Sequence, residues 1–293
     1  MFDPVYVAIE QGFDKARGVE IQMIGDILAG PTGIQAVAAG SADAGLSSVP
    51  AIINANASGL PIQGVIDIQT TMEGQALQRW YVRPDSPIYE LEDLCDPAVA
   101  DALGRKPIYA VNLLRSSFHY TSLMGFDQRG LPEDCVEWVL LSFADQIPAL
   151  VEGTVDVIGL IQPYQSFLAH DFEGQFREAW NDLDDITGPS HVSLIFVNRI
   201  WAENNPDVAK AFTLALRDAI NFIEADPDAS RAAVSKYTEI PEYAIPDYHF
   251  TENGLVDPAS VQRWMDYLTE RGDLTATWIT PEMVFTNSYN SDE

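Results

Sequence analysis

The sequence predicts an α/β fold of two lobes with mainly parallel sheets and a helical C-terminal part, and three observations support this prediction. The same pattern occurs twice: residues 36–43 and residues 149–156 each end in Gly-x-x-Asp, and a proline follows seven residues after each aspartate. Apolar strand-like runs alternate with helical segments, which is typical of parallel sheets. A chain of 293 residues is also long enough for two lobes of ordinary domain size.

The repeated pattern predicts a helix, a turn and a strand in each lobe. Gly40 and Gly153 are expected to end the two helices at the C′ position, where glycine adopts the left-handed conformation. Asp43 and Asp156 then open two buried strands. Because these aspartates lie at the strand entrances, we assign them a structural role and expect a ligand at the opposite ends of the strands. A cleft between two similar lobes is a usual place for a small ligand.

The order of apolar runs and turn residues predicts the elements of both lobes. In the first lobe, helices are expected over 4–13, 34–39 and 50–57, a loop at 30–33, and strands over 19–24, 44–48, 62–68 and 77–82. In the second lobe, helices are expected over 116–125, at the second copy of the repeat and over 163–167, and strands over 107–111, 136–141 and 157–161.

The remaining residues return to the first lobe. A strand over 193–197 is expected to cross back, and residues 206–225 carry an apolar stripe of helical period. Prolines in the first turn indicate further helices over 227–237 and 258–271. Residues 1–83 together with 196–293 are therefore predicted to form lobe I, and residues 84–195 lobe II. Two short crossovers between the lobes would allow hinge closure.

The composition excludes some classes of function. The formal net charge of −28, from 16 basic and 44 acidic residues, excludes a nucleic-acid-binding protein of the usual basic kind. The acidic residues are scattered, which suits either a well-solvated soluble surface or a saline habitat. No apolar run reaches the roughly 18 residues that a membrane span needs. No signal peptide is visible after Met1, although a mature or trimmed chain would also lack one.

The cysteines and histidines indicate no metal site. Cys95 and Cys135 are the only cysteines, which excludes cysteine-rich zinc and iron–sulfur sites. If the strands that follow them are parallel neighbours, the two thiols lie at one edge of a sheet and could form a disulfide, which would indicate an oxidising compartment; two unrelated thiols are the alternative. No cofactor motif or catalytic serine motif occurs. The four histidines, His119, His170, His191 and His249, show no ligand spacing.

Several motifs, in their order and spacing, resemble the solute-binding proteins of ABC importers, in the branch that takes up nitrate, taurine, aliphatic sulfonates and thiamine-precursor pyrimidines. The resemblance begins with Pro-Val-Tyr-Val-Ala-Ile-Glu-Gln-Gly-Phe at residues 4–13 and Gly-Val-Glu-Ile at 18–21, and it extends to about residue 290. It continues at 35–43, 85–88, 92–94, 149–156 and 205–212. It implies a type II periplasmic-binding-protein fold. The family normally has a strand before the first of these motifs, and this sequence has almost nothing there.

In such a fold, ligands meet the carboxyl ends of strands and the amino ends of helices. Ser116 and Ser117 could cap the next helix or bind a ligand, and Arg115 could hold a carboxylate or sulfonate or form a surface ion pair. Hydroxyls that end the apolar strand over 44–48 point to a ligand or to the next helix, and aromatic residues could stack on a ligand or pack in the core. The candidate ligand-binding residues are Tyr6, Thr32, Ser47, Ser48, Trp80, Asn112, Arg115, Ser116, Ser117, Phe118, Gln162, Tyr164 and His191.

The resemblance implies a non-enzymatic receptor that captures a small organic nutrient by hinge closure and delivers it to a membrane permease. It would act as a monomer, in the periplasm or outside the cell, with or without a lipid anchor. Arg115 and the serines favour a sulfonate- or taurine-like anion, whereas the aromatic residues would suit a pyrimidine or another flat ring. One alternative is an enzyme on the same fold. Thiamine-pyrimidine synthases resemble this chain but carry a cysteine cluster that it lacks. Menaquinone-pathway enzymes also use the fold, and His119 or His191 would then be the base. A sensory ligand-binding module is the other.

Overall fold

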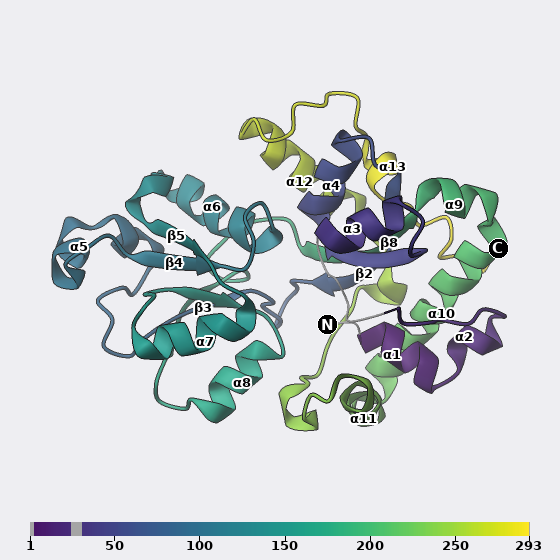
Figure 1. The fold of residues 1–293 in the computed structure, drawn as a ribbon, viewed down its shortest axis with the longest axis horizontal. Helices are drawn as coiled ribbons and strands as arrows, with labels where there is room; N and C mark the ends of the chain where they lie inside the picture. Colours follow the sequence, from purple (N-terminus) through teal and green to yellow (C-terminus); the bar gives the residue numbers. More distant parts are fainter. Residues whose placement is uncertain (1–2, 25–30, 293) are drawn as a thin grey trace. The chain divides into compact units, whose positions relative to one another are not determined.

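The polypeptide folds into two units, each built around its own β-strands (Figure 1). The computed structural model describes residues 3–24 and 31–292. Unit 1 comprises Met1–Thr70, Pro189–Glu242 and Asp247–Glu293, and unit 2 comprises Thr71–Gly188 and Tyr243–Pro246. Both crossovers lie earlier in the chain than the predicted boundaries at residues 83 and 195. The first does so because the strand over residues 79–82 pairs with strands of unit 2.

Unit 1 alternates helices and strands and then becomes helical. Its elements are α1 (Asp3–Glu10), α2 (Phe13–Ala16), α3 (Pro31–Ala38), β1 (Ala44–Ser48), α4 (Val49–Ala57), β2 (Ile62–Thr70), β8 (His191–Asn198), α9 (Arg199–Asn204), α10 (Pro206–Ala225), α11 (Pro227–Thr238), α12 (Pro258–Glu270) and α13 (Pro281–Val284). Proline occupies the first turn of α10, α11 and α12, where its missing N–H costs no hydrogen bond. The sequence therefore predicted the starts of these three helices correctly.

The sheet of unit 1 has the order β1-β8-β2, and β8 runs antiparallel to both neighbours. β1 and β2 consequently run parallel to each other on either side of β8. All nine residues of β2 are buried, as expected for a strand that is covered on both faces. Figure 1 draws α3 and α4 on one side of this sheet and α1 and α10 on the other.

Unit 2 has a two-stranded parallel sheet and a three-stranded antiparallel sheet, which a single bridge connects. Its elements are β3 (Arg79–Val82), α5 (Pro97–Leu103), β4 (Ile108–Val111), α6 (Ser117–Arg129), β5 (Glu137–Leu140), α7 (Phe143–Glu152), β6 (Ile158–Leu160), α8 (Tyr164–Asp171) and β7 (Arg177–Asn181). β4 pairs in parallel with β5 and, through a bridge from Tyr109 to Val157, with the start of β6. β3 lies antiparallel between β6 and β7. Each unit thus has parallel strands with one antiparallel strand inserted among them, β8 in unit 1 and β3 in unit 2.

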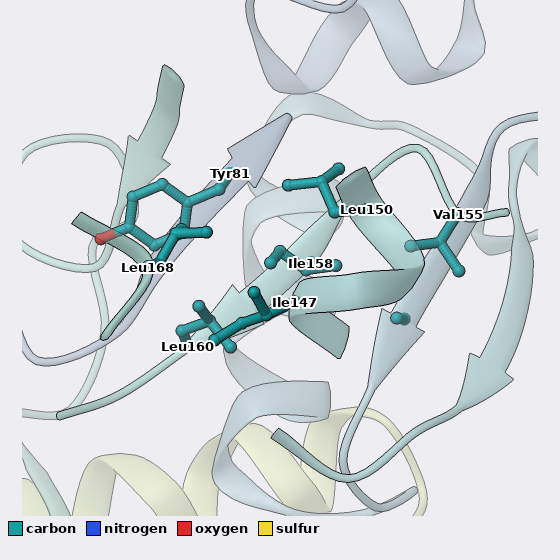
Figure 2. Close-up of a cluster of buried hydrophobic side chains, with 8 residues drawn as sticks. Tyr81, Ile147, Leu150, Val155, Ile158, Leu160 and Leu168 are labelled. Carbon is teal, nitrogen blue, oxygen red and sulfur yellow. The ribbon is translucent and has the colours of Figure 1, made fainter. Parts of the chain in front are cut away.

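The second copy of the repeated pattern forms part of the core of unit 2 (Figure 2). Leu150 lies in the last turn of α7, Gly153 follows the helix with a left-handed φ of 75°, and Val155 then leads into β6. Gly40 has the same φ of 75° after α3 in unit 1. Left-handed glycines let both helices stop sharply and turn into a buried strand. The buried cluster consists of Tyr81, Ala110, Ile147, Leu150, Val155, Ile158, Leu160 and Leu168.

One predicted strand is absent from the described residues, and one strand was not predicted. Residues 19–24 form no strand, although their side chains alternate between apolar and polar; they have no neighbouring strand with which to form a ladder. β7 was missed because its sequence, Arg-Glu-Ala-Trp-Asn, has no apolar alternation, and it is placed by its pairing with β3. Gly30 of the predicted loop at 30–33 lies outside the described residues, and Pro31 already begins α3.

The structure joins Cys95 and Cys135 in a disulfide, with their Cα atoms 5.0 Å apart.

The two repeated aspartates differ in environment. Asp156 is buried, and its carboxylate accepts hydrogen bonds from the Arg105 guanidinium and from the backbone N–H of Ile108 (2.8 Å). Asp43 is exposed, and its backbone carbonyl accepts from Asn198 (3.3 Å). The structural role predicted for Asp156 therefore has a direct physical basis in the entrance to β6.

Candidate functional site

In unit 1, two predicted hydroxyls lie where β1 ends and α4 begins. Ser47 is 2% exposed, and its Oγ atom has no hydrogen-bond partner among the described residues. Ser48 is the N-cap residue of α4, but its side chain makes no capping hydrogen bond. Such hydroxyls normally bond to the first N–H groups of the helix. The Ser47 hydroxyl is therefore buried without a partner, and the side chain of Ser48 leaves the first N–H groups of α4 uncapped.

Two other predicted residues of unit 1 do not join these serines. Tyr6 lies inside α1 and is buried, with its ring stacked on Tyr237 at 5.6 Å between centroids. Thr32 is exposed in the first turn of α3. The structure thus gives Tyr6 a packing role between α1 and α11.

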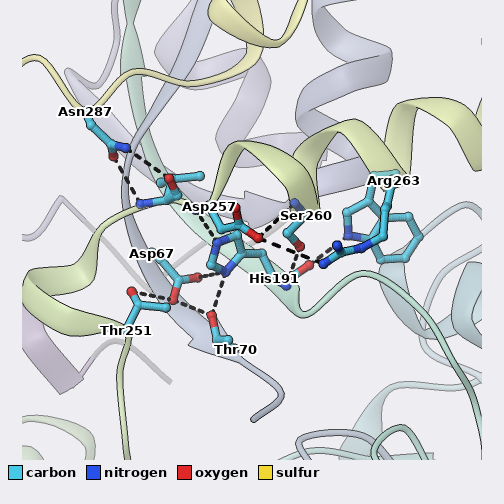
Figure 3. Close-up of polar contacts among 10 residues, drawn as sticks. Asp67, Thr70, His191, Thr251, Asp257, Ser260, Arg263 and Asn287 are labelled. Carbon is cyan, nitrogen blue, oxygen red and sulfur yellow. Dashed lines mark hydrogen bonds and ion pairs between the residues drawn. The ribbon is translucent and has the colours of Figure 1, made fainter.

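His191 is part of a buried polar cluster at the start of β8 (Figure 3). The backbone N–H of Asp257 donates to Nε2 (2.6 Å), so the proton of the neutral ring is on Nδ1. Nδ1 lies 2.6 Å from Oγ1 of Thr70 and 3.1 Å from the buried carboxylate of Asp67, which accepts from Thr70. Both ring nitrogens are therefore engaged, which overturns the prediction that His191 binds a ligand or acts as a base.

The backbone of His191 is held in the same way. Its N–H donates to Ser260 Oγ (2.9 Å), and its carbonyl accepts from Trp264 Nε1 (2.7 Å), both on α12. Thr251 adds a further hydrogen bond to Asp67 (3.2 Å). The cluster ties the end of β2, the start of β8 and α12 together and provides partners for buried polar groups, which is a structural function.

In unit 2, residues 112–116 connect β4 to α6. Ser116 is the N-cap of α6: its hydroxyl accepts from the N–H of His119 (3.4 Å) and donates to the Leu113 carbonyl (2.8 Å), with Asn112 Oδ1 at 3.2 Å. Ser117, the first residue of α6, makes no side-chain hydrogen bond among the described residues. Of the two predicted serines, Ser116 therefore caps the helix, whereas Ser117 is buried and its side chain caps nothing.

Arg115 is exposed and has a left-handed backbone, with φ of 63°. Such a φ is unfavourable for a residue with a Cβ atom. The N–H of Arg115 donates to Nδ1 of His119 (3.1 Å), one turn into α6. His119 therefore positions Arg115 at the start of the helix. The i, i+4 spacing of the two residues was the only sequence signal for this contact.

The predicted aromatic wall is not present in unit 2. Trp80 is fully buried, with Phe118 at 5.7 Å and Trp180 at 6.4 Å between ring centroids. Tyr164 packs against Phe143 at 5.6 Å, and the Gln162 side chain accepts from the N–H (3.3 Å) and hydroxyl (2.7 Å) of Ser166. Trp80 and Phe118 are core residues, and Gln162 stabilises the start of α8.

One carboxyl group outside these stretches titrates abnormally. Burial raises the pKa of Asp182 to about 6, although Thr71 donates a hydrogen bond to it (2.7 Å). Its Oδ1 atom has no hydrogen-bond partner within the described ranges. Among residues 3–24 and 31–292, no group of histidine, cysteine and acidic side chains is placed to hold a metal ion. No helix in these ranges is both long and apolar enough to cross a membrane.

The chain was compared with known proteins. The family model described as NMT1/THI5 like matches residues 1–230. A search of curated protein sequences found no significant match.

Three solved structures illustrate the fold. The aliphatic sulphonate binding protein SsuA of Escherichia coli aligns with a TM-score of 0.72 and 22% identity, over 93% of this chain and 85% of SsuA. The nitrate-binding protein NrtA of Synechocystis PCC 6803 aligns with a TM-score of 0.74 and 15% identity, over 98% of this chain and 83% of NrtA. The desulfurization enzyme DSZB aligns with a TM-score of 0.69 and 16% identity, over 98% of this chain and 94% of DSZB. The chain therefore has the periplasmic-binding-protein fold that its sequence predicted.

Proposed function

Because the chain belongs to the NMT1/THI5-like family, we propose that it is a solute-binding receptor of an ABC importer that captures a small organic anion. The structural neighbours with known cargo are a sulphonate-binding and a nitrate-binding protein, and both of these ligands are oxyanions. The observation that carries the proposal is the start of α6. There the unpartnered Ser117 hydroxyl lies beside an arginine that His119 holds in an unfavourable backbone conformation.

The chemistry of this site suits an oxyanion. The first N–H groups of α6 have no intrahelical acceptor, and the helix dipole favours negative charge there. An arginine fork adds two parallel donors of the geometry that carboxylates and sulfonates match. The burial of Trp80 and Phe118 in the core supports an anion rather than a flat aromatic ring.

The same proposal includes a location and a partner. A disulfide between Cys95 and Cys135 persists in an oxidising compartment, which supports a place outside the cytoplasm. A receptor there would deliver its ligand, as a monomer, to a membrane permease.

The test is binding of an anion panel to purified protein by calorimetry, covering sulfonates, taurine, nitrate, aromatic carboxylates and pyrimidines. Arg115→Ala should weaken binding of the true ligand by tenfold or more, and Ser117→Ala by several-fold, because each removes a donor to the anion. Arg263→Ala, which removes an exposed arginine from α12, is the matched control. Unchanged affinity in Arg115→Ala would contradict the anion site at α6.

An enzyme remains the second candidate, because DSZB has the same fold. The engagement of both His191 nitrogens removes one of the two histidines considered as a base. His119 is the other, and its Nδ1 atom already accepts from Arg115. Recovery of each bound compound unchanged after prolonged incubation would support the receptor, whereas a new product would establish an enzyme.

A further inference from the structure

Three polar side chains form a row across the sheet of unit 1, at the end where β1 and β2 finish. Ser193 of β8 lies opposite Ser48 of β1 on one side and opposite Gln69 of β2 on the other. Residues directly opposite each other in an antiparallel pair point to the same face, with Cβ atoms about 5 Å apart. These three residues, called the polar row below, therefore present their side chains together on one face of the sheet.

The polar row lacks the partners that buried polar groups normally have. Gln69 is 5% exposed and Ser193 is 7% exposed, and no member of the row makes a side-chain hydrogen bond among the described residues. A buried amide or hydroxyl without a partner costs free energy, because it has given up its bonds to water. The next row of the same sheet is apolar and consists of Leu46, Ile195 and Ile66. The polar row thus points to a partner that the chain itself does not supply.

The charges around the polar row favour a neutral partner. β1, β2, β8 and α4 contain no lysine or arginine that could pair with an anion. The buried carboxylate of Asp67, two residues before Gln69 on β2, would repel an anion. A cation is also disfavoured, because Ser48 is the N-cap of α4 and the amino end of a helix carries partial positive charge. The row itself contains only hydroxyl and amide groups, which both donate and accept hydrogen bonds.

We propose that the polar row is a binding site of unit 1 for a neutral group that both donates and accepts hydrogen bonds, such as a carboxamide. The side chain of Gln69 can form two parallel hydrogen bonds with a carboxamide, donating through its NH2 group and accepting through its carbonyl oxygen. The hydroxyl of Ser193, in the middle of the row, can rotate to donate or to accept. This site belongs to unit 1 and the anion site proposed at α6 belongs to unit 2, so either can fail while the other stands.

The test is an NMR titration of the purified protein with acetamide. Labelling with ¹⁵N makes the side-chain NH2 group of Gln69 and the backbone amides of Ser48 and Ser193 visible. Acetate has the same shape as acetamide but carries a charge, so it is the control for the probe. Gln69→Leu removes the amide from the row. Gln262→Leu, which removes an exposed glutamine from α12, is the matched control variant.

We expect acetamide to shift the signals of all three residues and to saturate in the millimolar range, because a ligand of so few atoms binds weakly. Acetate should bind at least tenfold more weakly. The shifts at Ser48 and Ser193 should disappear in Gln69→Leu and persist in Gln262→Leu. Shifts that do not saturate, or that are the same in Gln69→Leu, would overturn the proposal. Tighter binding of acetate than of acetamide would also overturn it and would assign the row to an anion.

The melting temperature without any probe gives a second, independent measurement. Gln69→Leu replaces an unpartnered buried amide by an apolar side chain of similar size, so it should raise the melting temperature by about 2 °C or more. A residue kept for a ligand stabilises the complex and not the free protein. A lower melting temperature in Gln69→Leu would show that the amide stabilises the free protein, and it would overturn the proposal.

Discussion

Buried carboxylates in this protein have different hydrogen-bond partners. Asp67 accepts hydrogen bonds from Thr70 and Thr251, and Asp156 accepts from Arg105 and a backbone N–H. Asp182 accepts a hydrogen bond from Thr71. The Oδ1 atoms of Asp67 and Asp182 have no hydrogen-bond partner among the described residues. Burial is the main cause of the raised pKa of Asp182, because burial disfavours the ionised form of a carboxyl group.

Asp182→Asn should make the protein more stable at neutral pH. The folded-state pKa of about 6 lies above the ordinary 3.8, so the folded protein retains a proton that the unfolded chain releases. This group therefore lowers the free energy of unfolding as pH rises from about 4 to 6, by at most about 3 kcal/mol, and the loss persists at higher pH. Urea unfolding at several pH values would measure it. In Asp182→Asn the free energy of unfolding should no longer fall between pH 4 and 6. In Asp101→Asn, at an exposed position, it should fall as in the parent protein.

The repeat offers a matched pair of aspartates. Asp156→Ala should cost roughly 3 kcal/mol of stability, because it leaves Arg105 and the N–H of Ile108 without an acceptor. Asp43→Ala, at the equivalent exposed position, should change stability by less than about 0.5 kcal/mol. Chemical denaturation of both variants provides the comparison. Equal losses would show that the carboxylate of Asp156 contributes nothing beyond the turn.

Residue identity alone could not separate binding residues from structural ones. A serine before a helix is read equally well as a cap or as a ligand-binding residue, and only the hydrogen bonds assign capping to Ser116 and not to Ser117. The hydrogen bonds of His191 could not be predicted from the residues around it, because its partners Thr70 and Asp257 are distant in the chain. Trp80 and Phe118 could equally have stacked on a ligand or packed in the core, and their neighbours place them in the core.

At the level of elements, the sequence predicted best where the signal is local. α10 has the predicted bounds because proline at its start and a long apolar stripe act within the helix itself. Both copies of the repeat were found for the same reason, since glycine fixes the turn. Strands depend on partners elsewhere in the chain. β7 pairs with β3 across about a hundred residues, and residues 19–24 lack a partner, so neither outcome could be read from the local pattern.

Removing the disulfide by Cys95→Ser with Cys135→Ser should destabilise the protein by roughly 4 kcal/mol. The two cysteines are 40 residues apart, and releasing a loop of that length increases the entropy of the unfolded chain by this order. Urea unfolding of the variant and of the reduced parent should agree. A variant as stable as the oxidised parent would contradict the effect. Because the cysteines lie within unit 2, the amides of unit 1 should keep their exchange rates at neutral pH.

For the whole molecule, charge is the dominant property. A net charge of −28 means that most carboxylates have no basic partner, although several arginines are paired, such as Arg17 with Asp218 at 2.7 Å. Repulsion among the remaining carboxylates disfavours the folded state at low salt.

The melting temperature should therefore rise by about 5 °C or more between 0.05 M and 1 M sodium chloride, where the screening length falls to roughly 3 Å. Replacing several exposed aspartates and glutamates by their amides should raise the melting temperature at low salt and leave it almost unchanged at high salt. A melting temperature that falls as salt is added would show instead that the ion pairs outweigh the repulsion.

The central place of β8 has a consequence for synthesis on the ribosome. β1 and β2 emerge first but do not pair with each other; each pairs with β8, which ends at Asn198. The main segment of unit 2, Thr71–Gly188, is complete before β8 emerges and can fold as a unit. Until then β2, whose residues are all buried in the finished protein, stays exposed. Chaperones that hold extended apolar segments would therefore compete with β8 for this strand, and slow translation between Thr70 and His191 would lengthen that period.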